Sequence, residues 1–352
     1  MKVSRKSLLR KYAYCYRHCR NCKVPAWVHV NVGGTPCTDF STAGSRKGWD
    51  GTTLGPTLAW ARVSDFAGVC AHENVVGFPQ LVEDRMSGRQ VQAIPASPAN
   101  LGYGQVQSRP RVYRCVGPAG QPRFDLDPAA LYTHLCAEAS SRMKPLQLRE
   151  IFQATDAEIQ AALEASCSLR AKSRRGKKRK AADVTSTFKD SLSPSGRMNL
   201  RRYKAKIKAE GRKGVVVSHL GDNPERFVCW NSKASGALPT LRRSMRELWV
   251  HHLRRPAMGS ELMCSMGWPP GCDLHVPLEM PLAEARRFLG NGMHLANIFA
   301  VLLCLLACTP TSTVQQGQAP AVHHRGDEGK LPSERERQLM AAFRRRLELA
   351  GA

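Results

Sequence analysis

The amino-acid sequence predicts an α/β fold, and three stretches in its first third carry that prediction. "AWVHVNVGG" (26–34) alternates apolar side chains and stops at two glycines, which is typical of a buried strand. "TLAWARVSDFAGV" (57–69) has apolar residues at helical spacing, and "RPRVYRCVG" (109–117) is again strand-like. Strands that alternate with helices along a chain indicate an α/β sheet.

Further elements are predicted between and after these stretches. "CAHENVVGF" (70–78) has the pattern of a strand end followed by a loop, and "LVEDRM" (81–86) that of a short helix. Residues 128–170 have helical spacing over most of their length.

Changes in composition divide the chain into five expected parts. A basic, cysteine-rich segment (1–27) precedes the first part of the α/β core (28–117), and a variable, basic region follows (118–237). The chain is expected to return to the core over 238–308, and a polar tail with a short charged helix (309–352) ends it.

The charge of the chain indicates an anionic partner. Lysine and arginine number 53 against 28 acidic residues, which gives a net charge of +25. Phosphates bind such surfaces without regard to sequence, so a nucleic acid is the expected partner, although basic disordered tails are an alternative source of the charge. The run "SLRAKSRRGKKRKAADV" (168–184) fits nuclear import, a nucleic-acid contact or a solvated linker. It favours the nucleus in a eukaryote and the cytoplasm otherwise.

The thirteen cysteines are scattered, and the N-terminus lacks the apolar core of a signal peptide, so reduced intracellular thiols are expected. One cluster, "CYRHCRNC", contains Cys15, His18, Cys19 and Cys22. These are zinc-ligand types, but no second knuckle is evident, so no metal site is assigned and zinc is left open.

The longest apolar run, 298–308, is about half of the roughly 20 residues that a membrane-spanning helix needs. A buried core helix is therefore predicted there, and no membrane contact.

Four short signals suggest chemistry. In chain order they are "GGTPCTDFSTAG" (33–44), "HENVVGF" (72–78), "QSRPRVY" (107–113) and "RRFLGNGMHLA" (286–296). A cysteine such as Cys37 is a strong nucleophile where cations lower its pKa. Arg109 and Arg111, two residues apart on an expected strand, are predicted to point the same way and to supply that charge, and Glu73 to move a proton. In a basic chain, this set suggests covalent chemistry on a nucleic-acid base.

In these motifs and in their order, the sequence resembles the DNA (cytosine-5) methyltransferases. That family has a Pro-Cys loop ending in Phe-Ser, a Glu-Asn-Val strand end, a Gln-x-Arg-x-Arg strand and a late Gly-Asn turn. This chain has "PCTDFS", "ENV", "QSRPR" and "GNGMHLA", with "GWP" at 267–269. The match covers about 28–117 and 238–305, and 118–237 lies where the family places its target-recognition region. The resemblance implies a partial Rossmann-like methyltransferase sheet with that smaller region inserted.

The resemblance also implies a mechanism. A cytosine is flipped out of double-stranded DNA, and Cys37 attacks its carbon 6. Glu73 contacts the N3 edge of the base, while Arg111 and Arg109 hold base and thiolate. Carbon 5 then takes a methyl group from S-adenosyl-L-methionine (AdoMet).

Other roles follow from the same resemblance. Asn291 and Pro36 are expected at the cofactor. The residues expected at the DNA or the active-site loop are Ser41, Gln107, Arg242 and Arg243.

One family feature is not found. The family begins with a glycine-rich AdoMet cradle, whereas the residues before Gly33 include neither glycine nor an acidic residue. The cofactor-binding half is thus expected to be missing, replaced or supplied by a second chain. Two alternatives to an active methyltransferase remain: a catalytically inactive DNA-binding relative, and an unrelated basic RNA- or chromatin-associated protein with a small zinc knuckle.

Overall fold

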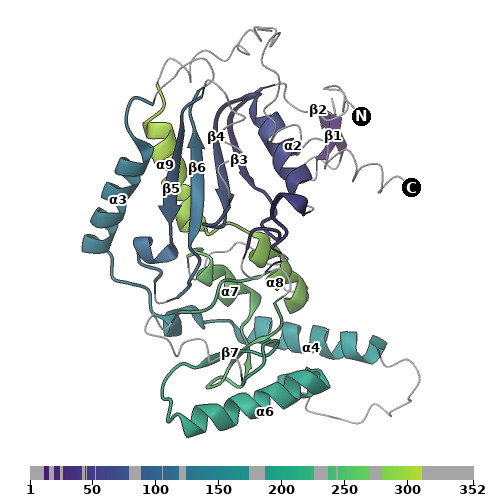
Figure 1. Ribbon diagram of the computed structural model, residues 1–352. Coiled ribbons are helices and arrows are strands. Elements are labelled where there is room, and N and C mark those ends of the chain that lie inside the picture. Colours follow the sequence, from purple (N-terminus) through teal and green to yellow (C-terminus); the bar gives the residue numbers. More distant parts are fainter. Residues whose placement is uncertain are drawn as a thin grey trace. The chain divides into compact units, whose positions relative to one another are not determined.

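The structure is a computed structural model (Figure 1). It describes residues 12–15, 20–23, 27–41, 44, 46–51, 53–78, 89–104, 106–118, 124–173, 187–225, 237–242, 245–269 and 280–310. The chain divides into two compact units. Unit 1 comprises Met1–Pro95, Arg111–Thr133 and Val301–Ala352, and unit 2 comprises Ala96–Pro110 and His134–Ala300.

A four-stranded mixed sheet forms the centre of unit 1, so the predicted α/β class is confirmed. Its strand order is β3 (Val28–Gly34), β4 (Ala67–Asn74), β6 (Arg111–Val116) and β5 (Val91–Ala96), drawn side by side in Figure 1. β3 and β4 are parallel, and β4 and β6 are antiparallel. All eight residues of β4 are buried, as expected for a central strand.

The predicted strand at 26–34 exists, but the prediction that it is buried was wrong. Within the described residues β3 pairs only with β4, so it lies at an edge of the sheet and alternates between half-buried and exposed side chains. Val32 is 37% exposed. Apolar alternation alone does not tell an edge strand from a central one.

Helix α2 (Leu54–Ser64) confirms the helix predicted near 57–69 but ends earlier. From Ala67 the chain is strand β4, because Ala67 and Val69 pair with Val28 and Val30 of β3. Trp60 and Ala61 of α2 pack on the core formed by Ala67, Cys70 and Val116. Strand β6 confirms the strand predicted over 109–117, whereas β5 had no counterpart in the sequence prediction. The helix predicted at 81–86 lies outside the described residues.

Unit 2 combines helices with a small antiparallel sheet. The helical prediction for 128–170 is confirmed by α3 (Pro128–Arg142) and α4 (Asp156–Ser173), with a 3-10 turn, η4 (Leu148–Ile151), between them. α3 begins in unit 1, which extends to Thr133. The other helices are α5 (Phe188–Ser191), α6 (Pro194–Ala209), α7 (Gly259–Ser265), α8 (Leu282–Asn291) and α9 (Leu295–Ala307), the last of which crosses into unit 1. The sheet consists of β7 (Val217–His219), β8 (Leu248–Val250) and β9 (Arg255–Pro256).

The expected return to the α/β core at 238 stays a prediction, and the two compact units are divided elsewhere. Residues up to Ala300 belong with the preceding region. The physical reason is strand pairing: β8, in the segment expected to return, pairs with β7 in the variable region. Leu238 and Val250 also share a hydrophobic core with Val217.

The apolar stretch 298–308 lies almost entirely in α9, which follows α8 after a short break. Leu282–Ala307 is long and apolar enough to cross a membrane by length and composition, and 33% of its most apolar window is buried. α9 buries Val301 and Leu305 and exposes Phe299 and Leu303. The core-helix interpretation of 298–308 stays a prediction.

The cysteine-rich segment is described only in part. β1 (Tyr12–Cys15) and β2 (Arg20–Lys23) pair antiparallel, with Ala13 opposite Cys22. His18 and Cys19 lie outside the described residues, and no cluster of three metal-ligand side chains is found in the part that the structure describes. The zinc alternative therefore remains untested, as do the predictions for 174–186 and 311–352, which also lie outside.

Gly267, from the "GWP" step, has φ +89°, and an added Cβ would lie 2.8 Å from His294 Cε1. Gly214 has φ +83° and open space around it. We expect Gly267→Ala to lower the free energy of unfolding by about 2–4 kcal/mol, because backbone strain and overpacking add. Gly214→Ala should cost only about 1 kcal/mol from strain. Urea denaturation of both variants measures the difference, and equal losses would contradict the packing role of Gly267.

Candidate functional site

The candidate site in unit 1 is built on the carboxyl ends of β3 and β4. The parallel register places Gly34 beside Glu73, and Thr35, Pro36 and Cys37 follow at once. In open α/β sheets, ligands bind at this end of the strands. The predicted nucleophile loop and the predicted Glu-Asn-Val strand end are therefore neighbours.

Thr35 ties these two strand ends together from a buried position. Its hydroxyl lies 2.9 Å from His72 Nε2 and 3.2 Å from Thr57 Oγ1. The Asn74 amide donates to the Thr35 carbonyl at 3.2 Å and to its hydroxyl at 3.1 Å. The Asn of the "ENV" motif thus fixes the backbone two residues before Cys37.

His72 is fully buried beneath this network. Its ring stacks on Trp60 with centroids 4.4 Å apart, and Phe78 packs edge-on at 5.5 Å. Burial, with a smaller contribution from the Arg114 charge, lowers the pKa of His72 to about 3. The imidazole is therefore neutral at pH 7 and supports Thr35 through a hydrogen bond between uncharged groups.

Asp39 anchors the loop after Cys37. Its carboxylate accepts hydrogen bonds from the Thr53 backbone N–H at 2.8 Å and from the Thr53 hydroxyl. Gly51 is required beside it, because a Cβ there would lie 1.7 Å from Asp39 Cγ. The Asp39 carbonyl also accepts a hydrogen bond from Gly48 N at 2.9 Å, so both the side chain and the backbone of Asp39 hold the loop.

Cys37 itself sits in a tight turn. Its carbonyl accepts from Phe40 N at 3.0 Å and Ser41 N at 2.8 Å. The side chain is half-buried and forms no disulfide, and the neighbouring Pro36 is exposed. A fixed backbone with a free thiol at its tip is the arrangement that a nucleophile needs.

Glu73 and Arg111 form an ion pair at the same site. Arg111 Nε lies 2.8 Å from Glu73 Oε1, and the two side chains are 11% and 10% exposed. They come from β6 and β4, which are adjacent in the sheet. The guanidinium orients the carboxylate, and both groups are nearly removed from water.

The strand predicted to carry both Arg109 and Arg111 includes only Arg111. β6 begins at Arg111, so the alternation of a strand does not reach Arg109. Arg109 belongs to unit 2, where it donates to the Leu241 carbonyl at 3.1 Å and to the Gly292 carbonyl at 2.6 Å.

Gln107 is also buried in the interior of unit 2. It is 1% exposed. With its amide nitrogen toward Ser265, it donates to the Ser265 carbonyl at 3.0 Å and accepts from Leu241 N at 3.3 Å. This placement organises three chain segments and leaves no part of the side chain on the surface for DNA.

The other predicted residues that the structure describes, Arg242 and Asn291, belong to unit 2. Arg242 Nη2 lies 3.4 Å from Asp222 Oδ1, and His219 Nδ1 contacts the same oxygen at 2.9 Å. Burial opposes the charge of Asp222, but the bond from His219 and the charges of His219 and Arg242 lower its pKa below the ordinary value. Arg243 lies outside the described residues, and Asn291 is exposed at the end of α8.

The two residues expected at AdoMet are not brought together within one unit. Pro36 and Asn291 are both exposed and belong to different units. The glycine pair that ends β3 is occupied from within, because a Cβ on Gly33 would lie 2.1 Å from Trp60 Nε1. Gly33 thus makes room for Trp60 and not for a ligand.

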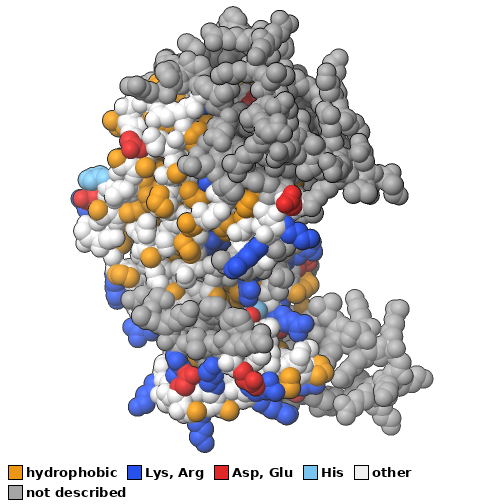
Figure 2. All heavy atoms as spheres, viewed as in Figure 1, with side chains coloured by type: hydrophobic (Ala, Val, Ile, Leu, Met, Phe, Trp, Pro, Cys, Tyr) orange, Lys and Arg blue, Asp and Glu red, His pale blue; other side chains and the backbone are white. Residues whose placement is uncertain are grey.

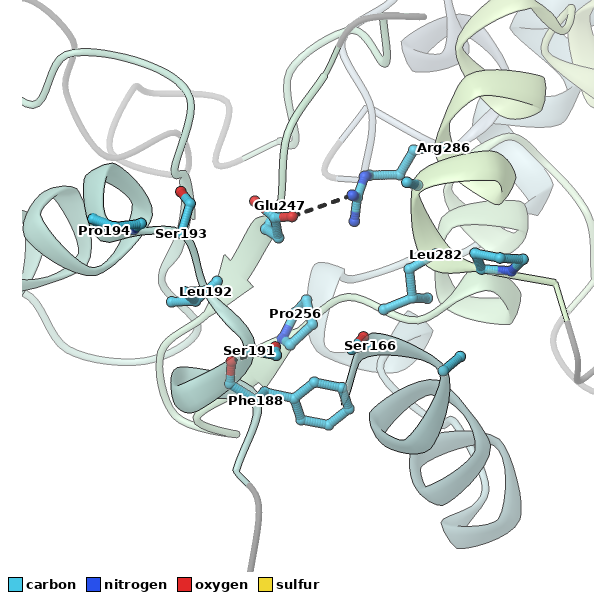
Figure 3. Close-up of a pocket in the computed structure, with 13 residues that line it drawn as sticks. Ser166, Phe188, Ser191, Leu192, Ser193, Pro194, Glu247, Pro256, Leu282 and Arg286 are labelled. Atoms are coloured by element: carbon cyan, nitrogen blue, oxygen red, sulfur yellow. Dashed lines mark hydrogen bonds and ion pairs between the residues drawn. The ribbon is translucent and has the colours of Figure 1, made fainter. Parts of the chain in front are cut away.

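Unit 2 contains a separate cavity of about 520 Å³ that includes none of the predicted residues. Figure 3 shows Phe188, Leu192 and Leu282 around it, with Glu247 and Arg286 facing each other at 3.4 Å. Arg286 is buried, and this burial lowers its pKa, while the Glu247 carboxylate opposes the shift.

Several residues that support the candidate site were not predicted from the sequence. Thr35, His72 and Asp39 are small or buried groups whose roles depend on partners far along the chain. Asp39 and Thr35 do flank the Pro-Cys step, which is the one signal that pointed to them. His294 and Asn297, just after the "GNG" turn, are buried with no side-chain hydrogen-bond partner within the described residues.

No protein-family model matches the sequence, and no curated protein matches it. Solved structures similar to this chain include methyltransferases. Dnmt2 methyltransferase of S. pombe is 14% identical, with a TM-score of 0.36 over 79% of this chain and 77% of that chain. A putative DNA modification methyltransferase encoded within an E. coli prophage is 13% identical, with a TM-score of 0.44 over 79% of this chain and 78% of that chain. These TM-scores are below 0.5, so the likeness is distant and indicates nothing about the chemistry of this chain.

The low pKa of His72 makes stability depend on pH. The unfolded imidazole takes up a proton below about pH 6.5, whereas the folded one stays neutral down to about pH 3. Unfolding is therefore favoured as the pH falls through this window, by about 1.4 kcal/mol per pH unit for this group. His72→Gln should flatten the dependence of unfolding free energy on pH between 6.5 and 4. The surface variant His134→Gln should keep the wild-type slope, and equal slopes in all three proteins would contradict a neutral buried His72.

Proposed function

We propose that this chain acts on cytosine in double-stranded DNA as a DNA (cytosine-5) methyltransferase-like protein, with Cys37 as the nucleophile. One observation carries the proposal: the Cys37 loop begins beside Glu73, and Asn74 bonds the backbone at its base. The free thiol, the buried carboxylate and its guanidinium partner thus belong to adjacent strand ends.

The chemistry follows from these groups. The Cys37 thiolate adds to carbon 6 of an extruded cytosine, and the electron pair displaced from the 5,6 double bond increases the density at carbon 5. Glu73, held by Arg111, contacts the N3 edge of the ring and assists its protonation. Carbon 5 then takes an electrophile, after which loss of its hydrogen as a proton and departure of Cys37 restore the ring.

AdoMet is the methyl donor that the resemblance implies. Since neither unit by itself brings the predicted cofactor residues together, the donor would be held by residues outside the described ones or by a second chain. The basic side chains of unit 2, Arg242 among them, would contribute to DNA binding, and Ser41 lies on the Cys37 loop.

Exchange of the cytosine C5 hydrogen with solvent tests the addition step without a methyl donor. In D₂O, addition of Cys37 to carbon 6 and deuteration of carbon 5, followed by elimination, leaves deuterium on the base. We expect mass spectrometry of a cytosine-containing duplex to show this exchange with the wild-type chain. Cys37→Ser should reduce its rate by at least about 10³-fold, and Glu73→Gln by about 10²-fold.

Cys136→Ala is the matched control, since it removes a half-buried thiol from α3 and should leave the exchange unchanged. Exchange that persists in Cys37→Ser would show that another group is the nucleophile. Duplex binding with no exchange in the wild-type chain would favour the inactive DNA-binding relative.

Calorimetric titration of the folded chain with AdoMet tests the cofactor prediction. We expect no binding at micromolar affinity by the chain alone, because Gly33 and the exposed Asn291 make no cradle. One-site micromolar binding would place the donor on this chain and contradict that expectation.

A further inference from the structure

A positively charged hollow lies in unit 2, whereas the residues that carry the proposed chemistry belong to unit 1. A hollow of about 510 Å³ is formed by the C-terminal half of α6, the segment after it and the turn between β8 and β9. Its lining residues are Lys204, Ile207, Lys208, Gly211, Arg212, Lys213, His251 and Arg254. Figure 2 shows Lys and Arg side chains over the part of the molecule where α6 lies.

The lining is strongly positive. Five of its side chains are cationic, and Arg212 alone of the five is paired with a carboxylate, that of Glu210, within the described residues. Lys204, Lys208, Lys213 and Arg254 are all exposed. Lysines near a helix C-terminus are favoured by the helix dipole, but that effect does not account for Arg254, which comes from another element.

Arg254 is held in an unfavourable backbone conformation. Its φ is +54°, in the left-handed region that glycine and asparagine adopt with less strain. The turn is closed by a bond from Arg254 N to the His251 carbonyl at 3.3 Å. An arginine at this strained position indicates a use for its guanidinium at the hollow.

The other lining residues indicate which kind of ligand the hollow can bind. Ile207 is the one large apolar residue of the lining, so the hollow does not bind an apolar body. Burial, with the charges of Lys204 and His252, lowers the pKa of His251 to about 4, so it adds no charge at pH 7. Its Nε2 lies 2.9 Å from Ser218 Oγ. A surface of closely spaced cations without an apolar anchor suits a chain of phosphates.

We propose that this hollow, the α6 hollow, binds the phosphodiester backbone of a nucleic acid. The inference rests on the proposed function for the identity of the ligand. Lys204 and Lys208, one helical turn apart, contact phosphates from one side, and Arg254 from the other. The contacts are independent of base sequence, because backbone contacts position a protein on DNA and base contacts specify the site.

The test compares two triple variants of the full chain that remove the same charge. The first is Lys204→Gln with Lys208→Gln and Arg254→Gln. The second, the control, is Lys144→Gln with Arg149→Gln and Lys189→Gln, three exposed cations elsewhere in unit 2. Affinity for a 20-base-pair duplex, for single-stranded DNA and for RNA is measured by fluorescence anisotropy between 50 and 200 mM KCl.

Each lost phosphate contact reduces the slope of log affinity against log salt by about 0.9 for duplex DNA and about 0.7 for single strands. We expect the first variant to lose about 2 to 3 from the duplex slope and at least tenfold in affinity, and the control to lose less than about 1. The nucleic acid whose slope changes most identifies the preferred backbone. Equal losses in both variants, or loss of binding to anionic phospholipid vesicles without a change for any nucleic acid, would overturn the proposal.

A single substitution separates binding from folding. Arg254→Gly relieves the backbone strain, so we expect its melting temperature to be no lower than that of the wild type while its duplex affinity falls. Unchanged affinity would contradict the contact. The deuterium exchange above decides the proposed function independently: exchange without a slope change rejects the hollow alone, and a slope change without exchange rejects the chemistry alone.

Discussion

Thr35 is the point on which the candidate site depends, because its one hydroxyl group joins three elements. His72 and Asn74 reach it from β4, and Thr57 reaches it from α2. Buried polar groups are costly unless each finds a partner, so the network fixes the backbone direction from which the Cys37 loop departs. The second anchor, Asp39 at Thr53, sets where that loop returns. A free thiol can occupy one defined position only because both ends of its loop are restrained.

The two arginines of the "QSRPR" motif belong to different units and have different partners. Arg111 holds the Glu73 carboxylate in unit 1, whereas Arg109 holds the carbonyls of Leu241 and Gly292 in unit 2. Pro110 between them marks both the start of β6 and the unit boundary. The motif therefore links the two units: one arginine pairs with a carboxylate of the candidate site, and the other holds backbone carbonyls of unit 2.

Much of this could be predicted from the sequence where the signal is local. The alternation in 28–34 and the apolar run around 111–116 specify strands, and a strand end was predicted from Cys70, although β4 begins already at Ala67. The Pro-Cys and Glu-Asn-Val steps fall at strand ends as expected. What could not be predicted depends on contacts between distant segments. The edge position of β3, the neutral state of His72 and the pairing of β7 with β8 all require knowing which segments meet. β5 was not predicted because Pro95 interrupts a short and weakly apolar run.

The discontinuity of unit 1 has a consequence for synthesis. Cys115 of β6 is fully buried, and its surroundings include Cys304 and Cys308, near the end of α9. The Asp125 N–H also donates to the Cys308 carbonyl at 2.9 Å. At a ribosomal rate of about 5–20 residues per second, about 10 to 40 s pass between the emergence of β6 and that of its cover. Throughout that interval one face of the sheet stays open to water, so the nascent chain presents an apolar surface to chaperones before it can complete its own core.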